Sequence, residues 1–437
     1  MALRTASALV ALLVALCVGH AHAAAPDPRE LRAGFAVALL DAPERGPLGG
    51  YGGAWDRRAT HGEIPGRKPQ ARALLLARGA QRVGIVTLDI VIVRPELRDA
   101  IAQRVRSLEL DPLLVIATHT HSGPGGYIEG FLAERLTSGS FDPAARESLV
   151  ESAARALRDA AAELAPAKLA AGLGSAELAR NRRDSADPVE RELPVIRVEI
   201  AGAAPLLVFA YGAHPTALTA RSRAYSSDYI GAARAWLEAR GWRSLFLPGP
   251  LGDQAPREPR SSVEVPPARP AAEPGEALAE QVGAALAQSA LEVADELEVV
   301  RRAELASVSE KLTLPPLKFR RFCALWWLAP MVRGGADRLL SEEVTVHSLA
   351  LGPARIVALP AEPTSAVGTA IRSAMRAHAA KAVPFVVAHT GDWIGYSVTA
   401  DRYERGGYES CLSFHGPDMG ARLVEAAAHA AQQLPAP

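Results

Sequence analysis

Residues 118–126 read THTHSGPGG and directly follow the apolar run Leu113 to Ala117. In an extended strand, side chains two positions apart share a face, so His119 and His121 would point to one side. Two imidazoles there could bind zinc together, or one could bind the metal while the other transfers a proton. The alternative is an incidental polar strand end, because a lone His-x-His pattern is a weak signal. The glycine-rich turn favours a ligand site, since such turns allow close backbone approach.

Several other apolar runs also end in ionisable side chains. Runs of this kind, rich in Val and Ile and stopped by Gly or Pro, are typical of buried strands. Ligand sites in α/β folds gather where strands end, which predicts a zinc cleft at the strand ends. The ionisable residues at these ends are Asp89, His214, Asp253, Glu362, His389 and Asp392.

Helical patterns lie between these runs. Apolar residues at helical spacing predict helices over 95–108, 144–164, 229–240, 274–297 and 364–379. The alternation predicts an α/β fold with mixed β-sheets covered by α-helices.

The overall composition excludes one class of partner. The 437 residues include 48 Lys and Arg against 48 Asp and Glu, so the formal net charge is zero. Such a chain has no electrostatic reason to bind nucleic acid, and no protein partner can be inferred.

The first 23 residues have the pattern of a signal peptide. Arg4 is followed by the apolar segment Leu9 to Val18, which is too short to span a bilayer, and Ala21-His22-Ala23 fits a cleavage site. Cys17 raises lipid attachment as an alternative, against which the large Leu16 counts. We therefore expect an exported protein, periplasmic or secreted. Only two cysteines would remain, Cys323 and Cys411, and their pairing is left open.

The motif at 118–126 resembles the signature of the neutral/alkaline non-lysosomal ceramidases. Members of that family are zinc amidases that split ceramide into sphingosine and fatty acid. Further stretches match in the right order from about Gly34 to Leu423. The resemblance implies that residues 24–437 form a single ceramidase-like catalytic domain.

The resemblance also implies roles for individual residues. It implies four protein ligands for Zn²⁺ and three further residues that take part in catalysis. Without it, Arg182 would be one more surface arginine and the two tyrosines would be packing residues at a sheet edge. The implied ligands are His119, His214, Glu362 and Tyr396, and the implied catalytic residues are His121, Arg182 and Tyr408.

Two departures from the family pattern leave the substrate open. Ala255 stands where the ceramidases usually carry a serine, and the chain ends soon after the catalytic region, whereas full-size members add a C-terminal β-sandwich domain. The first hypothesis is hydrolysis of N-acylsphingosine or a related N-acyl lipid by zinc-activated water. The alternatives are a zinc hydrolase of another amide, an ester or a lactone, and an inactive binding homologue.

Three further features carry competing interpretations. Asp228 either supports the metal site or caps a helix. His389 fits a packed residue beside the site better than an extra ligand. The aromatic stretch 319–332 is either a buried element or an apolar lid that binds acyl chains and contacts a membrane peripherally.

Overall fold

The structure is a computed structural model, and it describes most of the chain. The described residues are 27, 29–51, 57–130, 133–260, 273–300, 303–318, 320, 323 and 340–435. The predicted signal peptide therefore lies outside them, as do Phe319, Phe322, Trp326, Trp327 and Met331 of the aromatic stretch.

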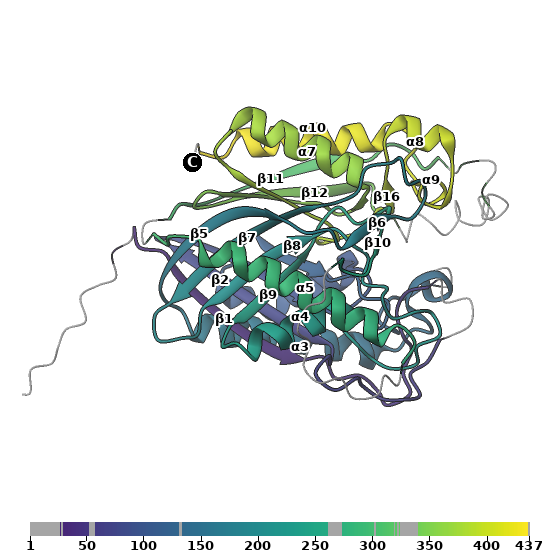
Figure 1. Ribbon diagram of the computed structural model, residues 1–437, viewed down its shortest axis with the longest axis horizontal. Helices are drawn as coiled ribbons and strands as arrows, with labels where there is room; N and C mark the ends of the chain where they lie inside the picture. Colours follow the sequence, from purple (N-terminus) through teal and green to yellow (C-terminus); the bar gives the residue numbers. More distant parts are fainter. Residues whose placement is uncertain are drawn as a thin grey trace, which may run out of the picture.

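Four layers make up the fold: helices, a large sheet, a smaller sheet and a second layer of helices (Figure 1). The large sheet has eight strands in the order β4-β3-β2-β1-β5-β7-β8-β9. The pairs β3–β4 and β8–β9 are parallel, and the other pairings are antiparallel. These strands are β1 (Arg32–Leu39), β2 (Gln70–Arg78), β3 (Gln81–Leu88), β4 (Leu113–Ala117), β5 (Ala165–Ser175), β7 (Glu192–Ile200), β8 (Leu206–Tyr211) and β9 (Arg243–Pro248).

The smaller sheet has four strands in the order β11-β12-β13-β15, of which only β13–β15 is a parallel pair. Two short pairs, β6–β10 and β14–β16, lie outside both sheets. The bounds are β11 (Leu305–Thr313), β12 (Glu343–Leu351), β13 (Ala354–Ala358), β15 (Val383–Val387), β6 (Ala179–Asn181), β10 (Gln254–Pro256), β14 (Glu362–Pro363) and β16 (Tyr396–Ser397).

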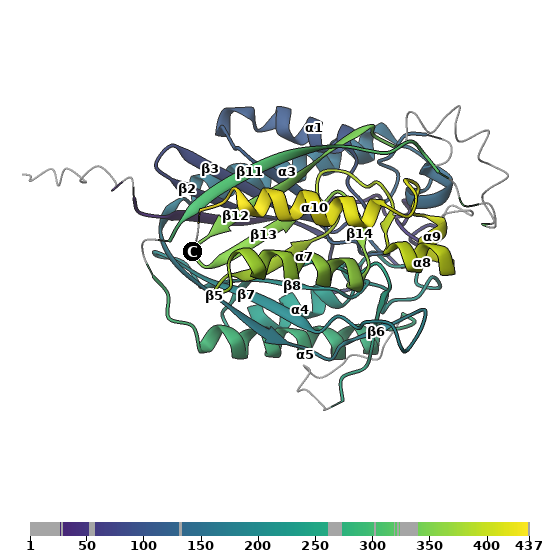
Figure 2. The same ribbon diagram turned by 90° about the horizontal axis from the view of Figure 1, so that it is seen from above.

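Helices cover the outer face of each sheet. Helices α1 and α3 pack on β1–β4, α4 and α5 pack on β7–β9, and α7 and α10 cover the smaller sheet (Figure 2). The longer helices are α1 (Pro95–Arg104), α3 (Pro143–Ala162), α4 (Asp228–Glu238), α5 (Glu276–Asp295), α7 (Ser365–His378) and α10 (Met419–Gln432), and the shorter ones are α8 (Ala400–Arg405) and α9 (Tyr408–Cys411).

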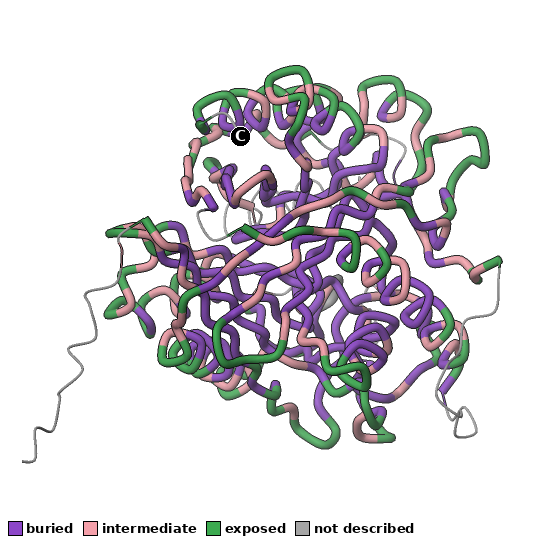
Figure 3. The backbone as a smooth tube through the Cα atoms, turned by 60° about the vertical axis from the view of Figure 1, so that its left-hand side comes forward, coloured by how far each residue is buried: buried purple, intermediate pink, exposed green. Residues whose placement is uncertain are grey.

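The core lies between the two sheets. Phe35 and Leu74 of the large sheet pack there with Ile356 and Phe385 of the smaller one, all at most 3% exposed. Figure 3 shows this buried backbone at the centre, with exposed residues on the outer helices and loops. No described helix has the length and apolar character needed to cross a bilayer.

The large sheet curls strongly without closing. Arg72 of β2 donates through Nη1 to the carbonyl of Ser244 in β9, at 2.9 Å, although four strands separate β2 from β9 in the sheet order. The curl brings its two edges, β4 and β9, toward one another. The sequence segments that follow β4 and β8 can therefore meet.

The predicted fold class is confirmed: mixed sheets are covered by helices, as in an α/β protein. The run Leu113 to Ala117 is β4 with unchanged bounds, and each predicted helix exists within a few residues of its expected ends. Strands such as β5 and the helix α10 were not predicted. Segment 165–175 is rich in Ala and Gly, and segment 419–432 is rich in Ala. These small residues differ little in hydropathy from the residues around them, so no clear strand or helix pattern marks either segment.

Candidate active site

His119, His214 and Glu362 converge at the ends of three strands. His119 follows β4, His214 follows β8, and Glu362 opens β14, just after β13. The Oε1 atom of Glu362 lies 2.8 Å from Nε2 of His214 and 3.4 Å from Nε2 of His119. Ligand atoms around a tetrahedral zinc ion lie about 3.4 Å apart, given bonds of about 2.1 Å. The three side chains, each at most 3% exposed, therefore have the chemistry and spacing of a metal site.

Further donors surround this centre. Two groups of residues offer ligand atoms that all lie within 4.8 Å of one another: His119 with His121 and His214, and His119 with Glu362 and His389. The hydroxyl of Tyr396 lies 3.5 Å from Nε2 of His214. The predicted ligand set is thus brought together, with His389 as an addition.

Hydrogen bonds from the backbone distinguish the histidines. Nδ1 of His119 lies 2.6 Å from the Val91 carbonyl, and Nδ1 of His214 lies 2.8 Å from the Gln254 carbonyl. A carbonyl can only accept, so both Nδ1 atoms carry the proton and both Nε2 atoms present a lone pair to the centre. Such a carbonyl contact is the usual way in which a metal-binding histidine is oriented.

His121 has the opposite pattern. The backbone N–H of Tyr51 donates to Nδ1 of His121 at 3.3 Å, so this nitrogen is the acceptor in the neutral ring. Its proton is then on Nε2, which lies 3.3 Å from Nε2 of His119. Gly50 permits the contact, because a Cβ there would lie 2.5 Å from the His121 ring. His121 therefore points an N–H bond, rather than a lone pair, toward the centre.

The strand alternation that predicted convergence of His119 and His121 is not the cause of it. The strand β4 ends at Ala117, and His119 has a left-handed backbone with φ of 69°. That bend, beyond the strand, turns His119 toward Glu362. The following glycines serve packing within the protein: a Cβ at Gly123 would lie 2.1 Å from the Asp89 carbonyl, and one at Gly125 would lie 2.2 Å from the Ser138 carbonyl.

Burial and neighbouring charge shift the pKa values in the centre. Burial lowers the pKa of His214 to about 4, assisted by the charge of Arg182. Burial, together with His119 and His214, holds the pKa of His121 well below its usual value. Burial tends to raise the pKa of Glu362, but His119 and His214 outweigh it and bring that pKa well below its usual range. The carboxylate form, which binds cations, is therefore favoured.

The second oxygen of Glu362 is also held. Oε2 accepts a hydrogen bond from the indole Nε1 of Trp393 at 3.1 Å. The Trp393 ring packs edge-on against Phe414, with centroids 5.9 Å apart. One carboxylate oxygen is thereby fixed by the indole, and the other faces the histidines.

Arg182, Tyr396 and Tyr408 form a second wall of the centre, which meets the first where the Tyr396 hydroxyl contacts His214. Arg182 donates through Nη2 to the Tyr396 hydroxyl at 3.0 Å, and through Nε to Glu409 at 2.9 Å. The ring of Tyr408 meets that of Tyr396 at 5.7 Å, and Tyr408 is 52% exposed. Burial and the charge of Glu362 raise the pKa of Tyr396 well above its usual value, which favours a neutral phenol in the metal-free protein.

Asp228 and Ala255 both lie near His214: Asp228 binds the loop that follows it, and Ala255 is next to Gln254, which contacts its ring. Asp228 is fully buried, accepts from the backbone N–H of Leu218 at 2.8 Å and is the first residue of α4 rather than its N-cap. It therefore holds the loop after His214. Ala255 follows Gln254, whose carbonyl contacts His214, and pairs with Arg180 between β10 and β6.

Sequence reasoning missed several contributors to the site. Val91 and Gln254 act through backbone carbonyls, which no side-chain pattern reveals. Trp393 and Glu409 could have been suspected only from their proximity to the motifs around Tyr396 and Tyr408. The pairing of Cys323 and Cys411, which the sequence left open, is a disulfide, and it ties Cys411 at the end of α9 to Cys323.

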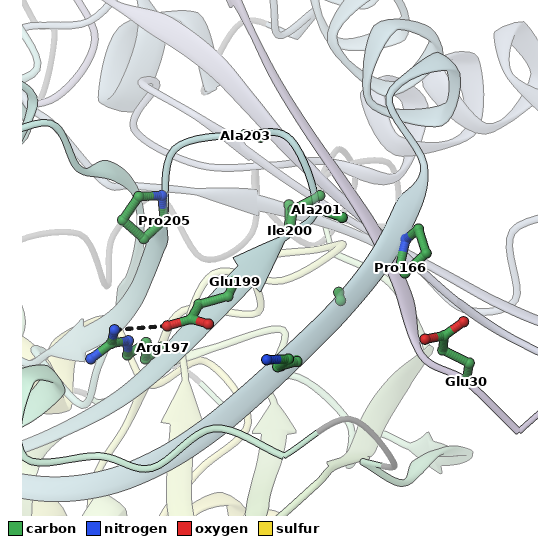
Figure 4. Close-up of a pocket in the computed structure, with 10 residues that line it drawn as sticks. Glu30, Pro166, Arg197, Glu199, Ile200, Ala201, Ala203 and Pro205 are labelled. Atoms are coloured by element: carbon green, nitrogen blue, oxygen red, sulfur yellow. Dashed lines mark hydrogen bonds and ion pairs between the residues drawn. The ribbon is translucent and has the colours of Figure 1, made fainter.

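A surface pocket lies at the opposite end of the strands. It is lined by charged and small residues, among them Lys168, Glu199 and Pro205 (Figure 4). Pro205 precedes the first residue of β8, whereas His214 follows the last. None of its lining residues belongs to the histidine centre, and two of its charged residues, Arg197 and Glu199, pair with each other at 2.7 Å.

Comparison with known proteins identifies relatives. Residues 65–245 match the family model described as neutral/alkaline non-lysosomal ceramidase, N-terminal. The resemblance to that family is confirmed. The predicted site residues within the matched range are His119, His121, Arg182 and His214, and those beyond it are Glu362, Tyr396 and Tyr408.

Individual ceramidases are similar in sequence or in fold. The neutral ceramidase of Mycobacterium tuberculosis (strain ATCC 25618 / H37Rv) is 26% identical over 174 residues, which cover 36% of this chain and 27% of that relative. The match thus spans about a quarter of the curated relative's length.

Two solved ceramidase structures share the fold. A ceramidase complexed with C2 is 18% identical with a TM-score of 0.75, covering 92% of this chain and 75% of the other. The neutral ceramidase of Pseudomonas aeruginosa is 19% identical with a TM-score of 0.73, covering 92% and 74%. At these identities the likeness establishes a common fold.

Proposed function

We propose that this protein is a zinc-dependent amide hydrolase of ceramidase type, which acts on N-acyl lipids. The observation that carries the proposal is the contrast between lone pairs and N–H bonds in the histidine cluster. His119 and His214 present lone pairs beside the Glu362 carboxylate, while His121 presents a proton. One cluster thus offers both metal ligands and a proton donor, in a chain that resembles the ceramidases.

Zinc would be held by His119, His214 and Glu362, with Tyr396 as a fourth donor. When bound, zinc supplies Lewis-acid polarisation of the amide carbonyl and activation of a water molecule. Three protein ligands of the His₂Glu type are familiar in hydrolytic zinc sites. The rest of the chemistry belongs to side chains of this chain.

His121 is the proposed proton donor to the leaving amine. Its Nε2–H points into the cluster, and the Tyr51 amide keeps the ring in that tautomer. Because its pKa is low, the ring is neutral at pH 7. A neutral imidazole does not release its N–H proton, so His121 would first take up the proton that the attacking water loses and would then pass it, as imidazolium, to the leaving amine, which leaves the ring neutral again.

Arg182 and Tyr408 are proposed to stabilise the charge that develops on the carbonyl oxygen. Burial opposes the charge on Arg182, but Tyr396, Glu409 and Glu362 outweigh it and raise the arginine pKa, so it stays cationic. The exposed Tyr408 lies over Arg182 and can contact a substrate that enters from solvent. Ala255 offers no hydroxyl, which agrees with attack by water and no acyl-enzyme.

The substrate, membrane and localisation proposals have separate support. The family match supports an N-acyl lipid, and such a substrate implies peripheral membrane contact. Export to the periplasm or beyond is supported by the N-terminal pattern and by the Cys323–Cys411 disulfide, since disulfides persist in oxidising compartments.

The test combines metal analysis with an acyl-release assay. The purified protein is assayed for zinc and for release of fatty acid from N-acylsphingosines and from short N-acyl amines, before and after chelation. We expect about one zinc per chain, release that chelation removes and zinc restores, and preference for the long-chain substrates. Zinc-loaded protein that cleaves esters or lactones, or nothing at all, would overturn the amide-hydrolase proposal.

A further inference from the structure

His389 occupies an unusual place directly behind the metal centre. It follows β15 and has a left-handed backbone with φ of 54°. Its N–H donates to the Ala361 carbonyl, and its own carbonyl accepts from the N–H of Ala117, both at 3.1 Å. The residue is thus clamped between the end of β4, which leads to His119, and the residue before Glu362.

The side chain of His389 is buried without a hydrogen-bond partner. It is 0% exposed, and neither ring nitrogen has a partner among the described residues. An unsatisfied buried polar group is destabilising, so an imidazole is a poor choice for mere packing. The ring stacks on that of His119, with centroids 4.0 Å apart and planes inclined by 14°.

The ring also lies within reach of the proposed metal position. His389 offers a nitrogen that lies within 4.8 Å of ligand atoms of His119 and Glu362. Two ligands of one zinc ion, at bonds of about 2.0–2.2 Å, can be separated by at most about 4.4 Å. The upper limit of 4.8 Å is close to that separation, so a nitrogen of His389 lies near the position that a further ligand would need.

We propose that His389 is an additional ligand of the cation held by His119 and Glu362. With His214, the centre then has three imidazoles and a carboxylate, and Tyr396 or a water completes a coordination number of at least five. The inference rests on the metal site of the proposed function and adds to it a ligand from a separate strand end, β15.

The test measures metal binding rather than turnover. His389→Leu removes both nitrogens and keeps an apolar side chain of moderate size. His415→Leu is the matched control, because His415 is also buried with Nε2 unpaired among the described residues, but it belongs to neither histidine group. We expect His389→Leu to lower zinc affinity in chelator competition by at least about 10-fold, comparable with or larger than the loss of a residue that orients a ligand. His415→Leu should leave that affinity within about twofold of the parent.

Cobalt spectra supply a second readout that is independent of the affinity measurement. Four-coordinate Co²⁺ absorbs visible light more strongly than five- or six-coordinate Co²⁺. The Co²⁺-loaded parent protein should show the weaker spectrum, and His389→Leu, or His389→Gln if the leucine variant does not fold, should shift it toward the stronger one. A strong four-coordinate spectrum in the parent, or unchanged affinity and spectrum in the variants, would overturn this assignment alone. A parent protein that binds neither ion would overturn the metal site of the proposed function as well.

Discussion

The two walls of the centre differ in burial and in how they are held. On one wall, His119, His214 and Glu362 are at most 3% exposed; His119 and His214 lie two and three residues beyond the ends of β4 and β8, and Glu362 is the first residue of β14. On the other, Arg182 follows the short strand β6, and Tyr408 begins α9 and is 52% exposed. The buried first wall is suited to hold a metal ion in a fixed position, and the more exposed second wall is suited to contact substrate.

The difference teaches which functions need rigid positioning. Metal ligands must stay within a few tenths of an ångström, and strand ends of a packed sheet provide that precision. The wall that faces substrate is held instead by side-chain contacts, chiefly those of Glu409 with Arg182 and Arg183. Changes in the first wall should therefore remove the metal, and changes in the second should spare it.

The largest effect is expected from Glu362→Gln. The substitution keeps the shape but removes the charge, so zinc affinity should fall by more than about 100-fold, because even the loss of residues that orient ligands costs about 10–100-fold. Activity should fall with it. The control is Glu190→Gln, a buried carboxylate paired with Arg372 at 3.0 Å, which should keep full zinc affinity. Zinc retained by Glu362→Gln, as measured by chelator competition, would contradict the ligand assignment.

His121→Gln should separate catalysis from metal binding. General acid–base groups contribute about 10²–10⁴-fold, so kcat should fall by that factor while zinc content stays at the parent level. His61→Gln serves as the control, since His61 is exposed and pairs with Glu273. Loss of zinc in His121→Gln would mean that His121 is a ligand and that its proposed role is wrong.

Arg182→Ala should give the next largest loss. Removal of one charge-stabilising donor costs about 10²–10³-fold in kcat, and zinc content should not change. Arg183→Ala is closely matched, because Arg183 also binds Glu409 but makes no described hydrogen bond to Tyr396. We expect less than about a 10-fold loss there. Equal losses in the two variants would indicate that both act only by holding Glu409.

Acid should destabilise the metal-free protein. The pKa of His214 is lowered from 6.5 to about 4 in the folded state, so the unfolded chain binds the proton first. The free energy of unfolding should fall as the pH drops from 6.5 to about 4, by up to about 3 kcal/mol from this residue. Asp228, whose pKa burial raises to about 6, acts in the opposite direction between pH 6 and 4.

Urea unfolding with a chelator at pH 7 and pH 5 measures this effect. The variant Asp228→Asn lacks the opposing contribution, so its stability should fall more steeply with acid than that of the parent. A stability that stays level or rises from pH 7 to pH 5 would show that the histidines are not buried in neutral form.

The smallest effect is expected from Ser122→Ala. The Ser122 hydroxyl is buried and has no partner among the described residues, and no step of the proposed reaction needs it. Turnover should change by no more than about twofold, which corresponds to about 0.4 kcal/mol in the activation barrier. A drop as large as that of His121→Gln would show that a serine nucleophile has replaced the one missing at Ala255.

The sequence by itself determined the elements and the residue types of the site. A short contiguous apolar run specifies β4, which is buried on both faces, and apolar residues at helical spacing specify the helices around it. The motif at 118–126, together with His214 and Glu362 beside later apolar runs, indicates a metal site from sequence alone. These features are local, so they can be read along the chain.

Only the tertiary structure decided which histidine presents a lone pair for a metal and which presents an N–H bond. The proton positions on His119 and His121 depend on Val91 and Tyr51, which are 28 and 70 residues away in the sequence. The stacking of His389 on His119 likewise depends on β15 meeting β4 across two sheets. Hydrogen bonds to backbone groups carry no side-chain signature, so the assignment of ligand and proton donor appears only when the curled sheet brings these segments together.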